Sequence, residues 1–281
     1  MKKIATVNDL SGFGKCSLTA AIPVISALGV QCCPLVTGVF SNQTGYDSFY
    51  CRDFTDDMRP CIEQWKKLGA NFDGILTGFI SNSRQGEIIG ELIDEFKTES
   101  TVVVVDPVMA DDGEIYKCYD SKSVQSIIAL CEKADLITPN LTELCVICGE
   151  DYNSIFSLEQ EELFEKIKTM SKKCREKGDK TVVTSGIHLP NKKIANTVLQ
   201  NGNFDIIVTD SVGESFSGTG DILSAFVTAQ YVKGVKVKTA VEQAAEFIYK
   251  AITSTIEETV GNYNCADGTH FERHLDMLTK L

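Results

Sequence analysis

Short strand-like runs alternate with longer stretches of helical periodicity along almost the whole of this 281-residue chain. Residues 101–106, TVVVVD, form the kind of continuous apolar run that fills a central strand buried on both faces. Residues 83–97 place Ile88, Leu92 and Phe96 at helical spacing. This alternation predicts an α/β fold with a central, mostly parallel sheet and helices on both of its faces. The other expected strands are residues 4–8, 33–39, 74–79, 135–139, 181–185 and 205–209, and the other expected helices are residues 17–28, residues 58–68 and a helix after Asp221.

Bulk properties narrow the class of protein. No repeat, low-complexity tract or linker divides the sequence, so we expect one domain over residues 1–281. A formal net charge of −12 argues against a nucleic-acid surface, which needs clustered lysine and arginine. The N-terminus lacks a signal-peptide core, and no run of about 18 apolar residues predicts a membrane span. We therefore expect a cytoplasmic protein that binds neither nucleic acid nor membranes.

The eleven cysteines do not form a recognisable framework. Their number is odd, and the single CxxC, Cys145 and Cys148, has no second CxxC or nearby histidine to complete a zinc site. Several lie inside apolar segments, where a free cysteine behaves as a small hydrophobic residue. The sequence therefore predicts reduced, structural cysteines.

Polar residues follow the expected strands at the point where each strand ends. Ligands of open parallel sheets bind beyond the carboxyl ends of the strands, so these residues are candidates for one site. The residues that follow the strands, polar ones and their neighbours, are Asp9, Ser11, Gly12 and Gly14; Thr77, Gly78 and Phe79; Asp106, Pro107, Asp111 and Asp112; Thr138, Pro139, Asn140 and Glu143; and Thr184, Ser185 and Gly186.

The Gly-rich stretch DLSGFGKCS, residues 9–17, matches neither common nucleotide-binding motif. A P-loop would need glycine at Asp9 and serine or threonine at Cys16. A dinucleotide fingerprint would need a third glycine at Ser17 and an acidic residue about 20 positions later. The stretch therefore predicts a tight strand-to-helix turn, which weakens the hypothesis of a nicotinamide-dependent enzyme.

The stretch ESFSGTGDILSAF, residues 214–226, has two interpretations. In the first, Gly218 and Gly220 form a turn and Asp221 caps a helix. In the second, the glycines expose backbone N–H groups at a helix N-terminus, where they stabilise the negative charge of a transferring phosphoryl group. Asp221 would then orient a substrate hydroxyl and accept its proton.

Asn140 and Glu143 also have two interpretations. They lie three residues apart in the first turn of a helix and, with Asp106 and Asp111, offer oxygen ligands for hydrated magnesium. The pattern Asn-x-x-Glu equally predicts a capping box at the start of that helix. One residue can serve both roles.

Five segments together resemble a known family. They are SNQTGY (residues 41–46), LTGF (76–79), DPVMADDGEIY (106–116), ITPNLTEL (137–144) and GTGD (218–221). The chain resembles the ribokinase-like superfamily and, within it, the pyridoxal/pyridoxamine (vitamin B6) kinases. GTGD marks only the superfamily, whereas SNQTGY followed by LTG and DPVM is more specific to B6 kinases. The resemblance covers almost the whole chain and implies a three-layer α/β/α fold.

The resemblance also implies an activity, namely ATP-dependent phosphorylation of the 5′-hydroxymethyl group of pyridoxal, pyridoxamine or pyridoxine. It implies magnesium, often a monovalent cation (K⁺ or Na⁺), and a homodimer. By position, it implies Asp221 as the base, with Gly218, Thr219 and Gly220 as the anion hole. It implies metal ligation by Asp106, Asn140 and Glu143; nucleotide contacts by Asp111, Tyr116, Thr138, Thr184 and Ser185; and substrate contacts by Asn8, Asp9, Ser11, Thr44 and Phe79.

Departures from the family pattern keep other substrates open. Many B6 kinases carry Gln-Ser-His where this chain has Asn8-Asp9-Leu10, so Asn8 stands where a serine contacts the pyridine. Phe79 replaces a common tyrosine. Hydroxymethylpyrimidine kinases of thiamine synthesis share Asp-x-Ser-Gly and DPVM, but typically carry cysteine after GTG. A B6 kinase is the first hypothesis, a hydroxymethylpyrimidine (phosphate) kinase the second, and a non-catalytic vitamin-binding homologue the third.

Overall fold

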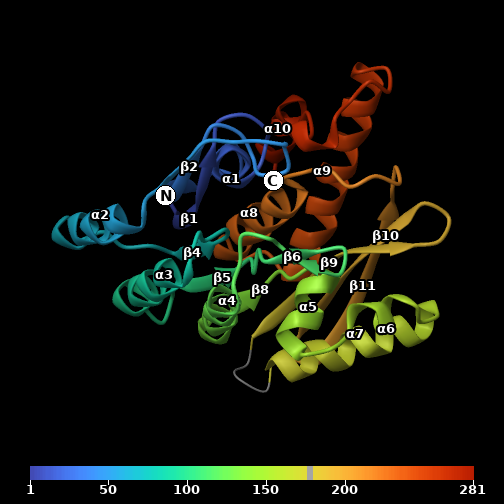
Figure 1. Cartoon of the computed structure of the whole chain (residues 1–281), viewed down its shortest axis with the longest axis horizontal. Helices are drawn as coiled ribbons and strands as arrows, with labels where there is room; N and C mark the ends of the chain where they lie inside the picture. Colours follow the sequence, from blue (N-terminus) through green and yellow to red (C-terminus); the bar gives the residue numbers. More distant parts are fainter. Residues whose placement is uncertain (176–179) are drawn as a thin grey trace.

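The computed structural model describes residues 1–175 and 180–281 (Figure 1). In this part of the chain the main sheet has nine strands in the order β11-β10-β9-β8-β5-β4-β1-β2-β3. The strands are β1 (Lys3–Ser11), β2 (Gln31–Phe40), β3 (Cys51–Asp53), β4 (Gly74–Thr77), β5 (Val102–Val105), β8 (Leu136–Ile137), β9 (Thr181–Leu189), β10 (Lys193–Gln200) and β11 (Asn203–Asp210). A separate small hairpin joins β6 (Ala110–Asp111) to β7 (Glu114–Ile115).

The sheet is parallel from β2 to β9, as the sequence predicts. The expected strand at residues 205–209 is instead part of an antiparallel hairpin with β10, a strand that the sequence reasoning missed. Asn201 and Gly202 form the two-residue turn of this hairpin with φ of 50° and 83°, the conformation that Asn-Gly adopts in type I′ turns. The short edge strand β3 was also missed and pairs antiparallel to β2.

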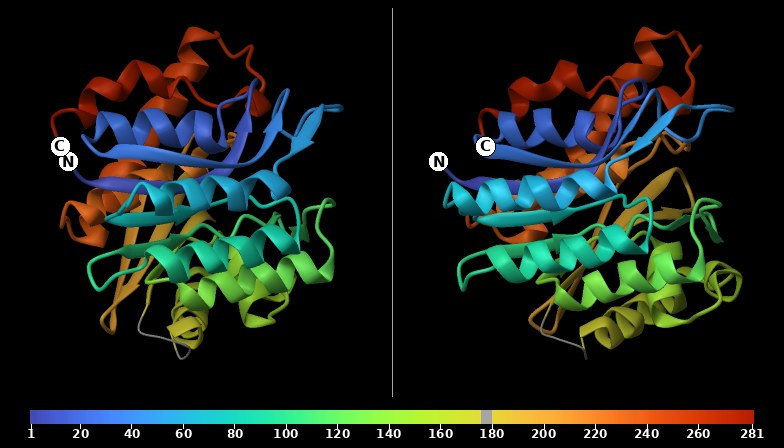
Figure 2. Two further views of the ribbon diagram at one scale, coloured as in Figure 1. Left: turned by 90° about the vertical axis from the view of Figure 1, so that its left-hand side faces the viewer. Right: turned by 60° about the vertical axis from the view of Figure 1, so that its left-hand side comes forward.

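Helices cover both faces of the sheet (Figure 2). The helices are α1 (Ser17–Ala27), α2 (Thr55–Lys67), α3 (Ser83–Phe96), α4 (Ser121–Lys133), α5 (Leu141–Cys148), α6 (Tyr152–Phe156), α7 (Gln160–Arg175), α8 (Thr219–Val232), α9 (Val237–Glu258) and α10 (Leu275–Leu278). Side chains of α1, α8, α9 and α10 fill one apolar core, and those of α2, α3, α4, α5 and α7 fill the other.

Alternation along the strands builds both cores at once. Val103 and Val105 of β5 lie in one core and Val104 lies in the other. Because successive strand side chains point to opposite faces, a strand between two helical layers must be apolar throughout. The predicted α/β fold, with its three α/β/α layers, is confirmed.

Two local expectations are corrected by the chain path. Strand β1 extends to Ser11, so Asp9 and Ser11 lie within the strand and not in the loop after it. Helix α8 begins at Thr219 with Gly218 as its N-cap, so Asp221 lies in the first turn and does not cap the helix. Within the described residues, no helix is both long and apolar enough to span a bilayer.

Candidate active site

The N-terminus of α8 forms one wall of the candidate site. Gly218 has a φ of 81°, and a Cβ at this position would stand 1.9 Å from the carbonyl oxygen of Lys15. Only glycine tolerates both the left-handed backbone and this contact. The first i→i−4 bond of the helix runs from the N–H of Ile222 to the carbonyl of Gly218, at 2.9 Å. The N–H groups of Gly220 and Asp221 precede it and are available to an anion.

Asp221 is half-buried, and its carboxylate is held in place by Asn8, near the N-terminus. Asn8 Nδ2 donates a hydrogen bond to Asp221 Oδ1 at 3.0 Å. Asn8 Oδ1 accepts from the N–H groups of Asp9 (3.0 Å) and Phe79 (2.9 Å). These bonds fix which end of the amide faces Asp221. The side chain of Asn8 is therefore directed to the carboxylate, and its expected contact with a substrate ring stays a prediction.

Burial and a neighbouring charge make Asp221 more basic than an ordinary aspartate. Burial raises its pKa to about 6, and the nearby Asp9 carboxylate adds to the increase. The Ser17 N–H and the Asn8 amide oppose the shift. Ser17 itself has a φ of 50°, a rare backbone conformation for a residue that is not glycine.

Two further buried carboxylates, Asp106 and Glu143, lie near Asp221 in the same site. Asp106 follows β5 and is 7% exposed, and burial followed by the charge of Asp221 raises its pKa to about 7. Glu143 is 4% exposed, and burial followed by the charge of Asp106 raises its pKa well above the usual value. Each carboxylate thus makes it harder to ionise its neighbour.

The predicted capping box of α5 is present. Asn140 Oδ1 accepts from the Glu143 N–H at 2.8 Å, and Glu143 Oε2 accepts from the Asn140 N–H at 2.9 Å. The same side chains also hold the segment between β5 and β6, because Glu143 Oε1 accepts from the Met109 N–H and Asn140 Nδ2 donates to the Ala110 carbonyl. The box therefore anchors the β6–β7 hairpin, and the metal-binding role of these two residues stays a prediction.

The β6–β7 hairpin carries two of the predicted nucleotide-side residues. The Tyr116 N–H donates to the Met109 carbonyl at 2.9 Å, and the Gly113 N–H donates to Thr142 Oγ1 at 3.0 Å. Burial and then the carboxylates of the site, Glu143 first, raise the pKa of Tyr116. Burial and then the charge of Asp112 raise the pKa of Asp111. The hairpin thus places Tyr116 near the acidic cluster, which consists of Asp106, Glu143 and Asp221.

Among the described residues, two threonine hydroxyls near the strand ends, those of Thr77 on β4 and Thr184 on β9, are buried without a hydrogen-bond partner. The hydroxyl of Thr138, after β8, is also buried and faces the Asp106 carboxylate, whose pKa it lowers against the larger effect of burial. A buried hydroxyl without a partner is uncommon and indicates a place for water or a ligand group. Thr138 and Thr184 were predicted as nucleotide contacts, and Thr77 was not assigned a role. Ser185 is tied to the loop before α5 by a bond from its N–H to the Pro139 carbonyl.

The predicted substrate residues are only partly brought together. Ser11 Oγ donates to Asp9 Oδ2 at 2.8 Å, and both side chains are buried. Phe79 packs against Phe40 and Tyr119, with ring centroids 5.8 Å apart in each pair. Thr44 is exposed on the 41–46 loop.

The 41–46 loop is anchored by residues that the sequence reasoning did not single out. Gln43 Nε2 donates to the Ala266 carbonyl at 3.0 Å, and the Tyr46 hydroxyl is hydrogen-bonded to Asp267. A hollow of about 480 Å³ lies beside the loop. It is lined by Phe13, Ser41, Asn42, Tyr46, Asp47 and Ser48.

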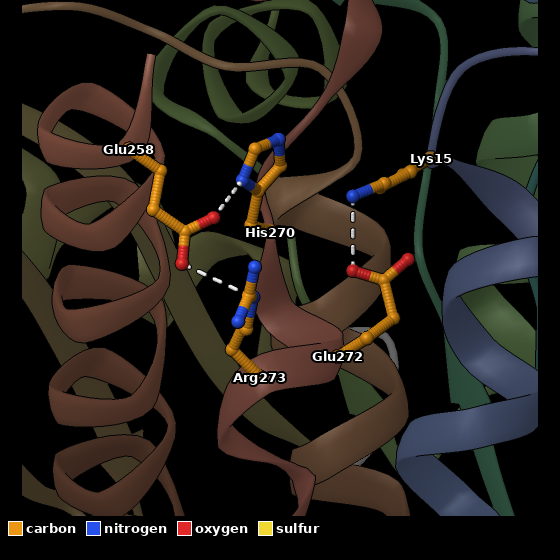
Figure 3. A pocket seen from close by; sticks show the side chains of 5 residues that line it. All are labelled: Lys15, Glu258, His270, Glu272 and Arg273. Carbon is orange, nitrogen blue, oxygen red and sulfur yellow. Dashed lines mark hydrogen bonds and ion pairs between the residues drawn. The ribbon is translucent and has the colours of Figure 1, made fainter. Parts of the chain in front are cut away.

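Lys15, the lysine of the Gly-rich stretch, is engaged elsewhere. It lines a hollow of about 370 Å³ formed with the C-terminal segment (Figure 3). Lys15 Nζ lies 2.9 Å from Glu272, and Glu258 accepts from His270 and Arg273 in the same hollow. The Lys15 side chain therefore points to the C-terminal segment, and it is the Lys15 backbone carbonyl that lies against Gly218. This agrees with the mismatch between the Gly-rich stretch and a P-loop.

Comparison with known proteins gives the family. The family model for phosphomethylpyrimidine kinase matches residues 14–265. A pyridoxal kinase of Leifsonia xyli subsp. xyli is 24% identical over 266 residues, which cover 91% of this chain and 90% of that protein. A hydroxymethylpyrimidine/phosphomethylpyrimidine kinase of Aquifex aeolicus is 26% identical over 241 residues, 83% of each chain.

Solved structures agree with these matches. A crystal form, with pyridoxal, of a candidate phosphomethylpyrimidine kinase from Bacteroides thetaiotaomicron is 34% identical, with a TM-score of 0.91 over 99% of this chain and 95% of that one. The pyridoxal kinase of Leishmania donovani in complex with ADP is 19% identical and shares the fold, with a TM-score of 0.87 over 99% and 96% of the two chains. The chain therefore belongs to the phosphomethylpyrimidine kinase family and is a ribokinase-like kinase related to the vitamin B6 kinases.

Proposed function

We propose that this kinase transfers the γ-phosphoryl group of ATP to the 5′-hydroxymethyl group of a B6 vitamer: pyridoxal, pyridoxamine or pyridoxine. The observation that carries the proposal is the position of Asp221. Its carboxylate lies in the first turn of α8, beside N–H groups available to an anion, and Asn8 holds it there. An alcohol and a phosphoryl group can meet at such a place.

In the proposed reaction, the substrate hydroxyl donates a hydrogen bond to Asp221 while its oxygen attacks the γ-phosphorus. The bond to the β-phosphate oxygen breaks, ADP leaves, and Asp221 takes the proton. A pKa of about 6 leaves Asp221 mostly ionised at neutral pH and still more basic than an exposed aspartate. The N–H of Thr219 lies 3.4 Å from the Phe216 carbonyl, so of the predicted anion hole the N–H groups of Gly218 and Gly220, together with that of Asp221, would stabilise the charge on the transferring group.

The acidic cluster fits a magnesium ion. Asp106 and Glu143 are buried carboxylates, and within residues 1–175 and 180–281 no lysine or arginine forms an ion pair with either of them. A cation would relieve their mutual repulsion. Among the described residues, no three His, Cys, Asp or Glu side chains are placed to hold a metal ion by themselves, so water and phosphate oxygens would have to complete the coordination. We propose that Asp106, Asn140 and Glu143 hold it, where it would neutralise phosphate charge.

On the nucleotide side, we propose that the β6–β7 hairpin covers the phosphates. Asp111 and Tyr116 lie on or directly after this hairpin, which Thr142 and the capping box of α5 hold against the sheet edge. Thr138, Thr184 and Ser185 line the same edge, and their buried hydroxyls or backbone would contact phosphate or bound water.

A second substrate is supported by specific observations. Asp9, Ser11 and Gly12 form the Asp-x-Ser-Gly pattern of hydroxymethylpyrimidine kinases, and a relative with that name matches 83% of the chain. Against it, the chain carries Asp221 after GTG and the SNQTGY loop, and the 34% identical relative was crystallised with pyridoxal. We therefore place the pyrimidine alcohol second.

The deciding experiment measures ADP formation with ATP and magnesium on four alcohols: pyridoxal, pyridoxamine, pyridoxine and hydroxymethylpyrimidine. Turnover of at least one B6 vitamer with a higher kcat/KM than the pyrimidine is expected. Turnover confined to the pyrimidine would move the assignment to that substrate. Calorimetric binding of a vitamer without ADP formation, at saturating ATP and magnesium, would indicate a non-catalytic vitamin-binding homologue.

A further inference from the structure

Two buried cysteines outside the candidate active site lie sulfur to sulfur. Cys148 is the last residue of α5, and Cys174 lies in the last turn of α7. Their Sγ atoms are 3.7 Å apart, and the two residues are 6% and 7% exposed. The sequence shows only the Cys145–Cys148 pair, because the partner on α7 is 26 residues away.

The contact between the two sulfurs and a nearby lysine set the chemistry of this pair. The Sγ–Sγ contact lowers the pKa of Cys174 and raises that of Cys148, while burial opposes the ionisation of both thiols. Lys173 lies next to Cys174 in sequence, and its Nζ donates to the Cys148 carbonyl at 2.7 Å. The two sulfurs are thus in contact beside the Lys173 ammonium group, and a nearby cation favours the thiolate form of a cysteine.

We propose that Cys148 and Cys174 are a reversible redox site, which forms a disulfide that links the C-terminal ends of α5 and α7 when the protein meets a peroxide. The sulfurs must approach by roughly 1.7 Å to reach a bond length of about 2.05 Å. The proposal requires the two buried side chains to change rotamer so that the sulfurs can close this distance. Nothing in the proposed kinase reaction uses either residue.

The chemistry balances with hydrogen peroxide as the oxidant. The Cys174 thiolate attacks one peroxide oxygen, the O–O bond breaks, and a sulfenic acid and one water form. Cys148 then attacks the sulfenic sulfur and displaces its oxygen as a second water. Two thiols lose two protons and two electrons, and the peroxide takes up both. A dithiol reductant reverses the reaction.

The link would restrain the helix that carries part of the candidate active site. Helix α5 begins directly after Asn140 and contains Glu143, and its eight residues span about 12 Å. A disulfide at Cys148 would tie the far end of this short helix to α7. We therefore expect the oxidised protein to have a higher midpoint of thermal unfolding than the reduced protein.

The test uses the reduced, full-length protein and hydrogen peroxide. After treatment, free thiols are blocked under denaturing conditions, and non-reduced peptides are mapped by mass spectrometry. The expected result is a cross-linked peptide pair containing Cys148 and Cys174, which disappears after treatment with dithiothreitol. The exposed Cys51, Cys61 and Cys118 report whether the oxidant has acted. If these three are oxidised while Cys148 and Cys174 remain free, or cross-link to other cysteines, the proposal is wrong.

Variants separate this pair from its neighbours. Cys174→Ser should abolish the cross-link and the rise in the unfolding midpoint caused by peroxide. Cys145→Ser is the matched control, because Cys145 is buried on the same helix, and it should keep both effects. Peptide mapping of the unmodified protein decides the question even if a serine variant folds poorly. A peroxide-dependent rise that persists in Cys174→Ser would also contradict the proposal.

Discussion

Asn8 on β1 and Asp221 on α8 lie 213 residues apart, and the Asn8 side-chain amide donates a hydrogen bond to the Asp221 carboxylate at 3.0 Å. The other end of the amide accepts two backbone N–H groups, so Asn8 cannot rotate without losing three hydrogen bonds. Gly78 makes room for it, because a Cβ there would stand 2.4 Å from Asn8 Nδ2. We infer that Asn8 positions the proposed base.

Replacing Asn8 tests this positioning role. Asn8→Ala removes a hydrogen bond to a charged group, worth about 1.5–3 kcal/mol, so kcat should fall roughly 10- to 100-fold. Because the Asn8 amide lowers the pKa of Asp221, the acidic limb of the kcat–pH profile should also move to higher pH. Steady-state kinetics from pH 5 to pH 8 measure both. An increase in KM with an unmoved profile would instead indicate a substrate contact.

Asp221 should govern the acidic limb of the unmodified enzyme. Burial raises its pKa to about 6, so the ionised, proton-accepting form is lost as the pH falls through that value. We expect kcat to decrease tenfold per pH unit well below pH 6. Asp221→Asn should lower kcat by roughly 10²- to 10⁴-fold and remove this limb. Unchanged circular dichroism and unfolding midpoint would show that the fold is intact; a variant that retains full kcat would exclude Asp221 as the base.

The two glycines of GTGD, Gly218 and Gly220, should differ in how much they contribute to the stability of the folded protein. Gly218→Ala forces a Cβ against the Lys15 carbonyl in a left-handed backbone, so the free energy of unfolding should fall by about 2 kcal/mol or more. Gly220→Ala is the matched variant, because a Cβ there meets no atom within 4 Å. It should leave stability unchanged or raised by up to about 1 kcal/mol.

Although Gly220→Ala should be stable, it should have reduced activity. The side chain added in Gly220→Ala would stand at the open N-terminus of α8, where we place the γ-phosphoryl group. We therefore expect a lower kcat in a protein that is fully folded by chemical denaturation. Full activity of Gly220→Ala would show that the phosphoryl group lies elsewhere.

Local sequence signals predict the regular parts of this molecule well. The apolar run of β5 and the helical spacing in α3 depend only on neighbouring residues, and both elements lie where expected. The Asn140–Glu143 capping box is also a local pattern, and it is present. Because parallel strands bring their carboxyl ends together, Asp106 after β5 and Glu143 after β8 lie close enough that, beside burial, the Asp106 charge raises the pKa of Glu143, whereas Asp9 and Ser11 lie within β1.

Contacts between distant segments could not be read from the sequence. The hydrogen bond from Asn8 to Asp221 and the approach of Gly218 to Lys15 depend on how β1 packs against α8. The β10–β11 hairpin is a different case, because Asn201-Gly202 is a strong local turn signal that sequence reasoning overlooked. Strand content alone does not distinguish an antiparallel edge from a parallel one.

The buried acidic cluster should make stability depend on pH and on magnesium. The pKa of Asp106 is about 7 in the folded protein and near 4 when unfolded, so folding favours its protonated form. The stabilisation is complete below pH 4 and is lost as the pH rises through 7. At pH 8 without magnesium, Asp106→Asn should therefore be more stable than the unmodified protein, by on the order of a few kcal/mol, and the difference should shrink at pH 5.

Magnesium should reverse this order, because the proposed site needs the Asp106 carboxylate. Millimolar magnesium should raise the unfolding midpoint of the unmodified protein at pH 8 and leave that of Asp106→Asn unchanged. Asp57→Asn, which removes one exposed carboxylate on α2, is the control and should respond to magnesium as the unmodified protein does. Urea denaturation at pH 5 and pH 8, with and without magnesium, measures all four conditions. If magnesium stabilises Asp106→Asn as much as the control, the metal is held elsewhere and the proposed site is wrong.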